Sequence, residues 1–131
     1  GGPKIGLNET LLGIAAPPWL GQLMVRTVGF REAERALGLG VLYGPEEALG
    51  VGLVDEVVPK EEVGDAAMRE AVRWAGIPPK ARVASKLLTR KEFVNGLDRK
   101  EDTDHFCFYI KDEEVQRYLA KYVEGMKKKR A

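Results

Sequence analysis

Prolines and glycines divide this chain into short segments, and the division limits the folds that it can adopt. Pro18 and Pro45 stand where helices can begin, because proline is tolerated in a first helical turn. Glycines stand where helices can end. The pattern predicts helices over residues 18–28, 30–37, 44–50, 61–75, 80–94, 106–110 and 112–124. Short extended segments are expected at residues 5–7, 41–42 and 53–58, too few for a closed sheet. The expected fold class is therefore α/β and mostly helical.

Apolar residues spaced by three and four give these helices their expected inward faces. Two of these faces lie in the middle of the chain. The helix over residues 61–75 would bury Val63, Ala67, Ala71 and Trp74, and the helix over residues 80–94 would bury Val83, Leu87 and Val94.

Length and composition indicate an ordinary globular protein. The chain has 131 residues and a net charge of +1, which gives no general argument for nucleic acid or membrane as a partner. Its single cysteine, Cys107, excludes an internal disulfide and fits a reducing compartment. With one histidine, His105, a metal site of His and Cys ligands is not expected. We expect His105 at the surface and Cys107 buried and inert.

Charge is distributed unevenly along the chain. Residues 80–100 hold seven basic and two acidic side chains, and residues 127–130 are basic again. A basic helix can bind nucleic acid, which would show as an affinity that falls steeply with salt. It can equally be the solvated face of an amphipathic helix, with aliphatic stems packed and charged heads in water. The second interpretation is favoured.

Glu9 is the first candidate for catalysis, because it is the only acid among the first thirty residues and its neighbours are mostly apolar or small. A carboxylate in such surroundings tends to lose hydration, and a poorly hydrated carboxyl can both take and return a proton near neutral pH. The alternative is an acid in a surface turn whose bend is shaped by Asn8.

Residues 34–59 combine a helix, an extended link, a short helix opened by acids and a further extended segment. Together with residues 5–19, this stretch resembles the enoyl-CoA hydratase/isomerase (crotonase) superfamily, and in particular its isomerase branch. The resemblance runs from about Ile5 to the C-terminus. It implies that residues 1–60 are the end of the crotonase spiral core with its catalytic loop, and that residues 61–131 are the C-terminal helical, oligomerising region.

The resemblance also implies a role for two neighbouring residues. In the family one glutamate moves a proton between C2 and C4 of a 3-enoyl-CoA, and that glutamate corresponds to Glu9. The asparagine before it, which lies at the substrate pocket in the family, corresponds to Asn8. The expected activity is transfer of the 3-enoyl-CoA double bond to the 2-trans position in beta-oxidation, without a metal or a cofactor, since coenzyme A is part of the substrate.

Several further expectations follow from the same resemblance. The chain begins without methionine and looks like a C-terminal half, so we expect the oxyanion-hole donors to lie outside it and the chain alone to be inactive. We expect a homotrimer at full length, the mitochondrial matrix as location, and neither membrane nor nucleic acid as partner. The alternatives are a hydratase of the same superfamily and a non-catalytic oligomerisation or RNA-binding module.

Overall fold

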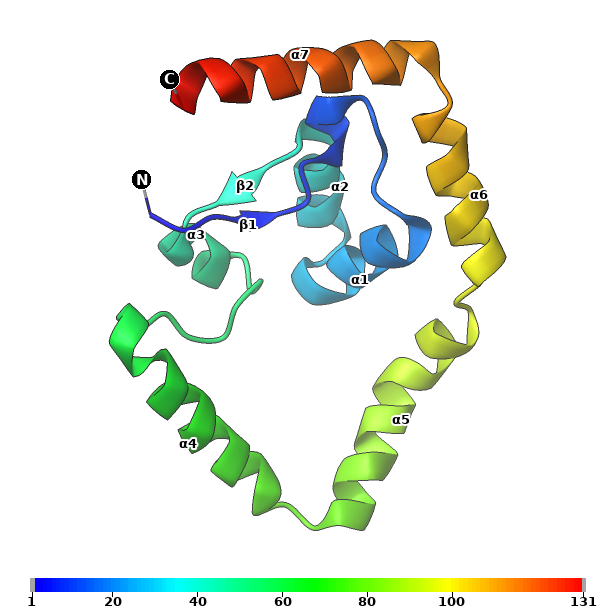
Figure 1. The fold of residues 1–131 in the computed structure, drawn as a ribbon. Coiled ribbons are helices and arrows are strands. Elements are labelled where there is room, and N and C mark those ends of the chain that lie inside the picture. The colour runs from blue at the N-terminus through cyan, green and yellow to red at the C-terminus, as the bar shows by residue number, and fades with distance from the viewer. Residues whose placement is uncertain (1, 131) are drawn as a thin grey trace. The chain divides into compact units, whose positions relative to one another are not determined.

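The structure, a computed structural model, describes residues 2–130 and is mostly helical, as the sequence predicts. The described residues form two compact units (Figure 1). Residues 2–55 and 98–130 make the first unit, and residues 56–97 make the second.

The first unit joins both ends of the described chain. A two-stranded antiparallel sheet pairs Ile5 with Tyr43 and Gly6 with Leu42. The elements of this unit are β1 (Ile5–Gly6), the 3₁₀ turn η1 (Glu9–Leu12), α1 (Pro18–Val28), α2 (Phe30–Leu39), β2 (Leu42–Tyr43), α3 (Pro45–Gly50), α6 (Arg99–Ile110) and α7 (Glu113–Arg130). In Figure 1, α7 passes over η1, and α6 lies beside α1.

The core of the first unit lies where α1, α2, α3 and β2 meet. Its buried side chains are Met24, Ala33, Ala36, Tyr43 and Ala48. The three alanines are almost completely inaccessible to solvent. Because an alanine side chain is a single methyl group, the two alanines of α2 allow α1 and β2 to approach the helix closely. This packing fixes α2, and η1 contacts α2.

The second unit contains the 3₁₀ turn η2 (Lys60–Glu62), α4 (Val63–Ala75) and α5 (Pro79–Asn95). Among its described residues only Ala66 is buried. Trp74 on α4 and Leu87 on α5 are more than half exposed. The predicted inward faces of both helices are therefore wrong for the described chain. The reason is physical: an amphipathic face is buried only where other apolar side chains cover it.

The prediction for residues 53–58 is also wrong, because no strand forms there. A strand needs a neighbour to pair its backbone groups, and the described part of the chain provides none at this point. Instead the backbone N–H of Leu53 donates to the carbonyl of Ala48 at 2.8 Å, and the Leu53 and Val54 side chains pack on the core of the first unit.

No helix in residues 2–130 combines the length and the apolar character that crossing a membrane requires.

Candidate active site

The candidate catalytic residue, Glu9, opens the turn η1 directly after β1. The turn is closed by backbone hydrogen bonds from Leu11 to Asn8 at 3.0 Å and from Gly13 to Thr10 at 3.1 Å. Gly13 ends it in the left-handed conformation, with φ of 76°. A short strand followed by a glycine-ended turn thus places Glu9 at a fixed point of the backbone.

The carboxyl group of Glu9 is poorly hydrated. The residue is half-buried, and its Oε2 atom is buried without a hydrogen-bond partner among the described residues. Buried polar atoms in proteins are almost always paired, so this carboxyl oxygen of Glu9 is an exception. This environment differs from the fully solvated surface turn that was the alternative for Glu9.

Asn8, the other predicted site residue, is adjacent to Glu9 and also half-buried. It occupies the N-cap position of η1, but its side chain makes no capping hydrogen bond there. The turn is therefore formed by its backbone bonds and by Gly13, without help from the Asn8 amide.

Helix α2 supports the turn from one side. The Thr10 hydroxyl donates a hydrogen bond of 2.6 Å to the carbonyl of Leu37. Leu11 lies against Gly40, where a methyl group in place of the glycine hydrogen would stand 2.7 Å from Leu11 Cγ. A real Cβ almost never comes that close to a carbon atom, so any side chain at residue 40 would force the Leu11 side chain to shift. The end of α2 therefore sets the position of Glu9 relative to the core.

A second cluster of polar residues joins α2 to β2. The Glu32 carboxylate accepts hydrogen bonds from Arg35 Nη2 at 2.6 Å and from the buried Tyr43 hydroxyl at 2.5 Å. The Arg35 guanidinium, and then the Tyr43 hydroxyl, hold the pKa of Glu32 below its ordinary value. Burial, together with the hydrogen bond to Glu32, raises the pKa of Tyr43 to about 12.

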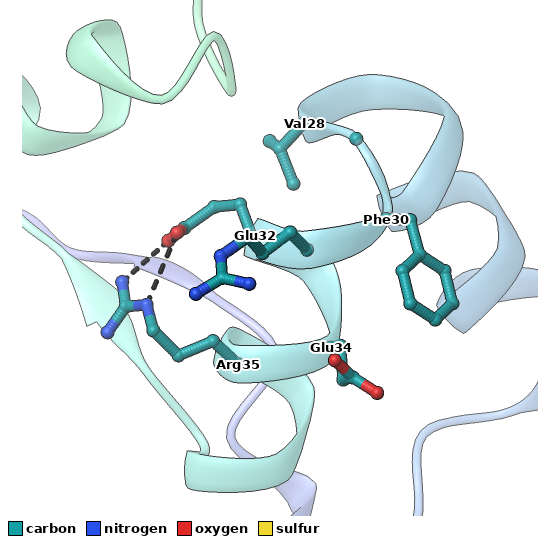
Figure 2. Close-up of a pocket in the computed structure, with 7 residues that line it drawn as sticks. Val28, Phe30, Glu32, Glu34 and Arg35 are labelled. Atoms are coloured by element: carbon teal, nitrogen blue, oxygen red, sulfur yellow. Dashed lines mark hydrogen bonds and ion pairs between the residues drawn. The ribbon is translucent and has the colours of Figure 1, made fainter.

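Figure 2 shows two members of this cluster, Glu32 and Arg35. They line a hollow of about 600 Å³ at the start of α2. The Glu32 carboxylate points to Arg35, whereas Glu34 points away from the pair. Neither Asn8 nor Glu9 lines this hollow. Glu32 and Arg35 neutralise each other here, so we assign the cluster to holding β2 on α2 and not to catalysis.

Sequence reasoning missed this cluster. The spacing of Glu32 and Arg35 by three residues on a helix was a readable signal for an ion pair. Tyr43 joins them because it is buried in the core beside α2, a tertiary contact that no local pattern reveals.

The sequence predicts a surface position for His105, and the structure differs from this prediction. His105 is half-buried in α6, and its Nε2 atom lies 3.1 Å from the carbonyl oxygen of Ala15. Cys107 is only half-buried. Within residues 2–130, no group of three or more His, Cys, Asp or Glu side chains is arranged to hold a metal ion.

Comparison with known proteins identifies the family. The family model described as Enoyl-CoA hydratase/isomerase matches residues 2–130. The chain belongs to the enoyl-CoA hydratase/isomerase family. This result confirms the predicted crotonase-type fold, of which the chain is a helix-rich part.

Relatives of this chain that carry the name of an isomerase include a mouse and a human protein. The mouse protein "Enoyl-CoA delta isomerase 1, mitochondrial" (Mus musculus) is 44% identical over 128 residues, which cover 96% of this chain and 44% of that protein. The human protein of the same name is also 44% identical, over 96% of this chain and 42% of that protein.

A solved structure gives the same result. The crystal structure of human mitochondrial delta3-delta2-enoyl-CoA isomerase superimposes with a TM-score of 0.87 at 43% identity, covering 98% of this chain and 50% of that chain. The chain thus spans less than half the length of the curated relatives described above.

Proposed function

We propose that the protein is an enoyl-CoA delta isomerase that moves a 3-enoyl-CoA double bond to the 2-trans position by proton transfer through Glu9. Membership of the family and the isomerase names of the mouse and human relatives, each 44% identical to this chain, support this activity. The observation in this chain that supports it most is the half-buried Glu9 with its unpaired, buried Oε2 atom.

The chemistry fits a single carboxyl group. In the proposed reaction the Glu9 carboxylate removes a proton from C2, and the electron pair of that C–H bond spreads into a dienolate. The same carboxyl then returns a proton to C4, which leaves the double bond between C2 and C3. A lysine would be protonated at neutral pH, and a serine would be too weak a base without a partner. Asn8 would lie at the acyl chain beside this carboxyl.

The thioester oxygen gains negative charge in this step. Backbone N–H groups that stabilise such charge contribute several kcal/mol to catalysis, about 3–4 for one donor. In the superfamily these donors come from segments that precede the stretch resembled by this chain. We therefore expect the 131 residues, assayed alone, to show little or no turnover.

Further features of the proposed enzyme are implied by the resemblance to the family, and the names of the relatives support the mitochondrial location. We propose the mitochondrial matrix as its location and the beta-oxidation of unsaturated fatty acids as its pathway. We also propose a homotrimer at full length, with no cofactor apart from the coenzyme A of the substrate. The division into a core part, residues 1–60, and a helical part, residues 61–131, stays a prediction for the intact protein.

The decisive experiment is an assay of the full-length protein with 3-hexenoyl-CoA, followed by product analysis. We expect trans-2-hexenoyl-CoA as product and a kcat about 10²- to 10⁴-fold lower for Glu9→Gln. Glu34→Gln, which removes the charge of an exposed acid on α2, is the matched control and should leave kcat unchanged.

Three other outcomes of these experiments would contradict the proposed function or favour an alternative. A 3-hydroxyacyl thioester as the main product would indicate the hydratase alternative. Undiminished isomerisation by Glu9→Gln would refute the proposed role of Glu9. Binding of RNA with a steep dependence on salt, in a protein without turnover, would support the non-catalytic module.

A further inference from the structure

Two helices from the far end of the chain contact the segment that follows Glu9. Figure 1 shows α7 passing over η1 and α6 descending beside α1. Each helix presents one aromatic side chain to this segment, Tyr118 from α7 and His105 from α6.

Tyr118 packs on the glycine that ends the turn. A methyl group at Gly13 would stand 3.1 Å from Tyr118 Cδ2, with Tyr118 Cγ and Cβ close behind at 3.6 and 3.7 Å. The edge of the ring therefore lies directly over the Gly13 backbone. Gly13 has φ of 76°, so the direction in which the chain leaves η1 depends on a conformation that L-residues rarely adopt.

His105 holds the next part of the same segment. Its Nε2 atom lies 3.1 Å from the Ala15 carbonyl oxygen. A carbonyl oxygen only accepts hydrogen bonds, so Nε2 carries the hydrogen in this contact. The Tyr109 ring packs against the imidazole in an edge-type arrangement, with ring centroids 5.0 Å apart. The imidazole is thus a donor for Ala15.

The segment that begins with Glu9 is therefore held from two directions. On one side Thr10 and Leu11 are attached to the end of α2. On the other side α6 and α7 hold Gly13 and Ala15. The proposed reaction requires one carboxyl group to reach two carbons of the substrate in turn. A displacement of about 1 Å at such a group can lower the rate about a hundredfold.

We propose that His105 and Tyr118 are positioning residues, which keep the Glu9 carboxyl where it reaches both C2 and C4. The proposal rests on the proposed isomerase activity, and it assigns to the C-terminal helices a part in the proton transfer. Neither side chain touches the substrate in this role, since each acts through the backbone at Gly13 or Ala15.

The test uses the full-length protein and 3-hexenoyl-CoA in D₂O. Mass spectrometry of the recovered substrate reports deuterium at C2, and product formation reports delivery to C4. For His105→Ala and Tyr118→Ala we expect a kcat about ten- to a hundredfold lower with little change in KM. We also expect more C2 exchange per isomerisation. Once the proton on the Glu9 carboxyl has exchanged with D₂O, a displaced carboxyl returns a deuteron to C2 of the dienolate more often than it delivers one to C4.

Conservative variants separate positioning from simple loss of stability. His105→Gln retains an N–H that can donate to Ala15, and Tyr118→Phe retains the ring over Gly13, so both should keep most of kcat and the normal exchange ratio. Phe106→Ala and Tyr122→Ala remove aromatics from the same two helices other than the two side chains placed at Gly13 and Ala15, and they should match the wild type. If Tyr118→Ala does not fold, Tyr118→Leu tests the same contact with more apolar bulk.

The results distinguish the two proposals. An unchanged exchange ratio in all the His105 and Tyr118 variants, with Glu9→Gln inactive, would overturn the positioning role alone. The same conclusion would follow if kcat fell only with the folded fraction. Full isomerisation by Glu9→Gln would overturn the proposed function itself.

Discussion

Tyr43 shows how one buried hydroxyl can tie a strand to a helix. Its side chain is 3% exposed, and its hydroxyl donates to Glu32, which also binds Arg35. The phenolate form is disfavoured here by burial and by the neighbouring carboxylate, and for this reason the pKa of Tyr43 rises to about 12. Stability should therefore depend on pH in the alkaline range.

We expect the free energy of unfolding to fall as pH rises from about 10 to about 12. In this range Tyr43 ionises in the unfolded chain, whereas the folded chain keeps the proton. The unfolded state then binds fewer protons, and stability falls with pH. Below pH 10 the contribution is fully present. Urea unfolding at several alkaline pH values measures this change. The free energy of unfolding of Tyr43→Phe should fall less over this pH range than that of the wild type. Tyr122→Phe, which removes the hydroxyl of an exposed tyrosine on α7, should show the same fall as the wild type. If the free energy of unfolding fell equally with pH in all three proteins, this account would be contradicted.

At the scale of elements, the helix ends are set by local chemistry. Asp112 accepts hydrogen bonds from the backbone N–H groups of Glu114 at 2.8 Å and Val115 at 3.0 Å, at the start of α7. The Asp98 side chain does the same for Lys100 and Glu101 at the start of α6. Both helices that hold the Glu9 segment thus begin at an aspartate cap.

Asp112→Ala should lower the free energy of unfolding by about 1 kcal/mol, because it leaves the first N–H groups of α7 without their acceptor. Asp112→Asn keeps an oxygen acceptor and should cost much less. Denaturant unfolding of the two variants measures the difference. A loss of the same size for both variants would mean that the charge of Asp112, and not its capping bonds, stabilises α7.

The positions of prolines and glycines in the sequence predicted the ends of several helices. Pro18 and Gly29 bound α1 as expected, and Pro45 and Gly50 bound α3. The strand expected at residues 53–58 failed because extended structure depends on a partner elsewhere in space. The position of Glu9 in a turn followed from the sequence. The contacts of that turn with Leu37, Tyr118 and His105 did not, since they join residues far apart in the chain.

At the scale of the whole molecule, the described chain divides into units of unequal packing. The first unit has a cluster of buried side chains, whereas Ala66 is the single buried side chain described in the second. Stability in proteins varies in the same way, and regions with little buried apolar surface open most easily.

Hydrogen exchange on the 131-residue chain should report this difference directly. We expect amides of α4 and α5 to exchange with opening free energies at least about 2 kcal/mol below those of α1 and α2. Mass spectrometry with peptide resolution is sufficient, and amides of α3 provide an internal reference from the better packed unit. Uniform protection across the chain would show that the second unit is stabilised by something other than its own core.

The bond between His105 and Ala15 joins residues 90 positions apart. During synthesis the ribosome must therefore release His105 before Ala15 can meet its imidazole partner. Until then the segment from Glu9 to Ala15 lacks this contact. Such distant closures slow folding, because the entropy of a long loop is lost before the contact can compensate for it.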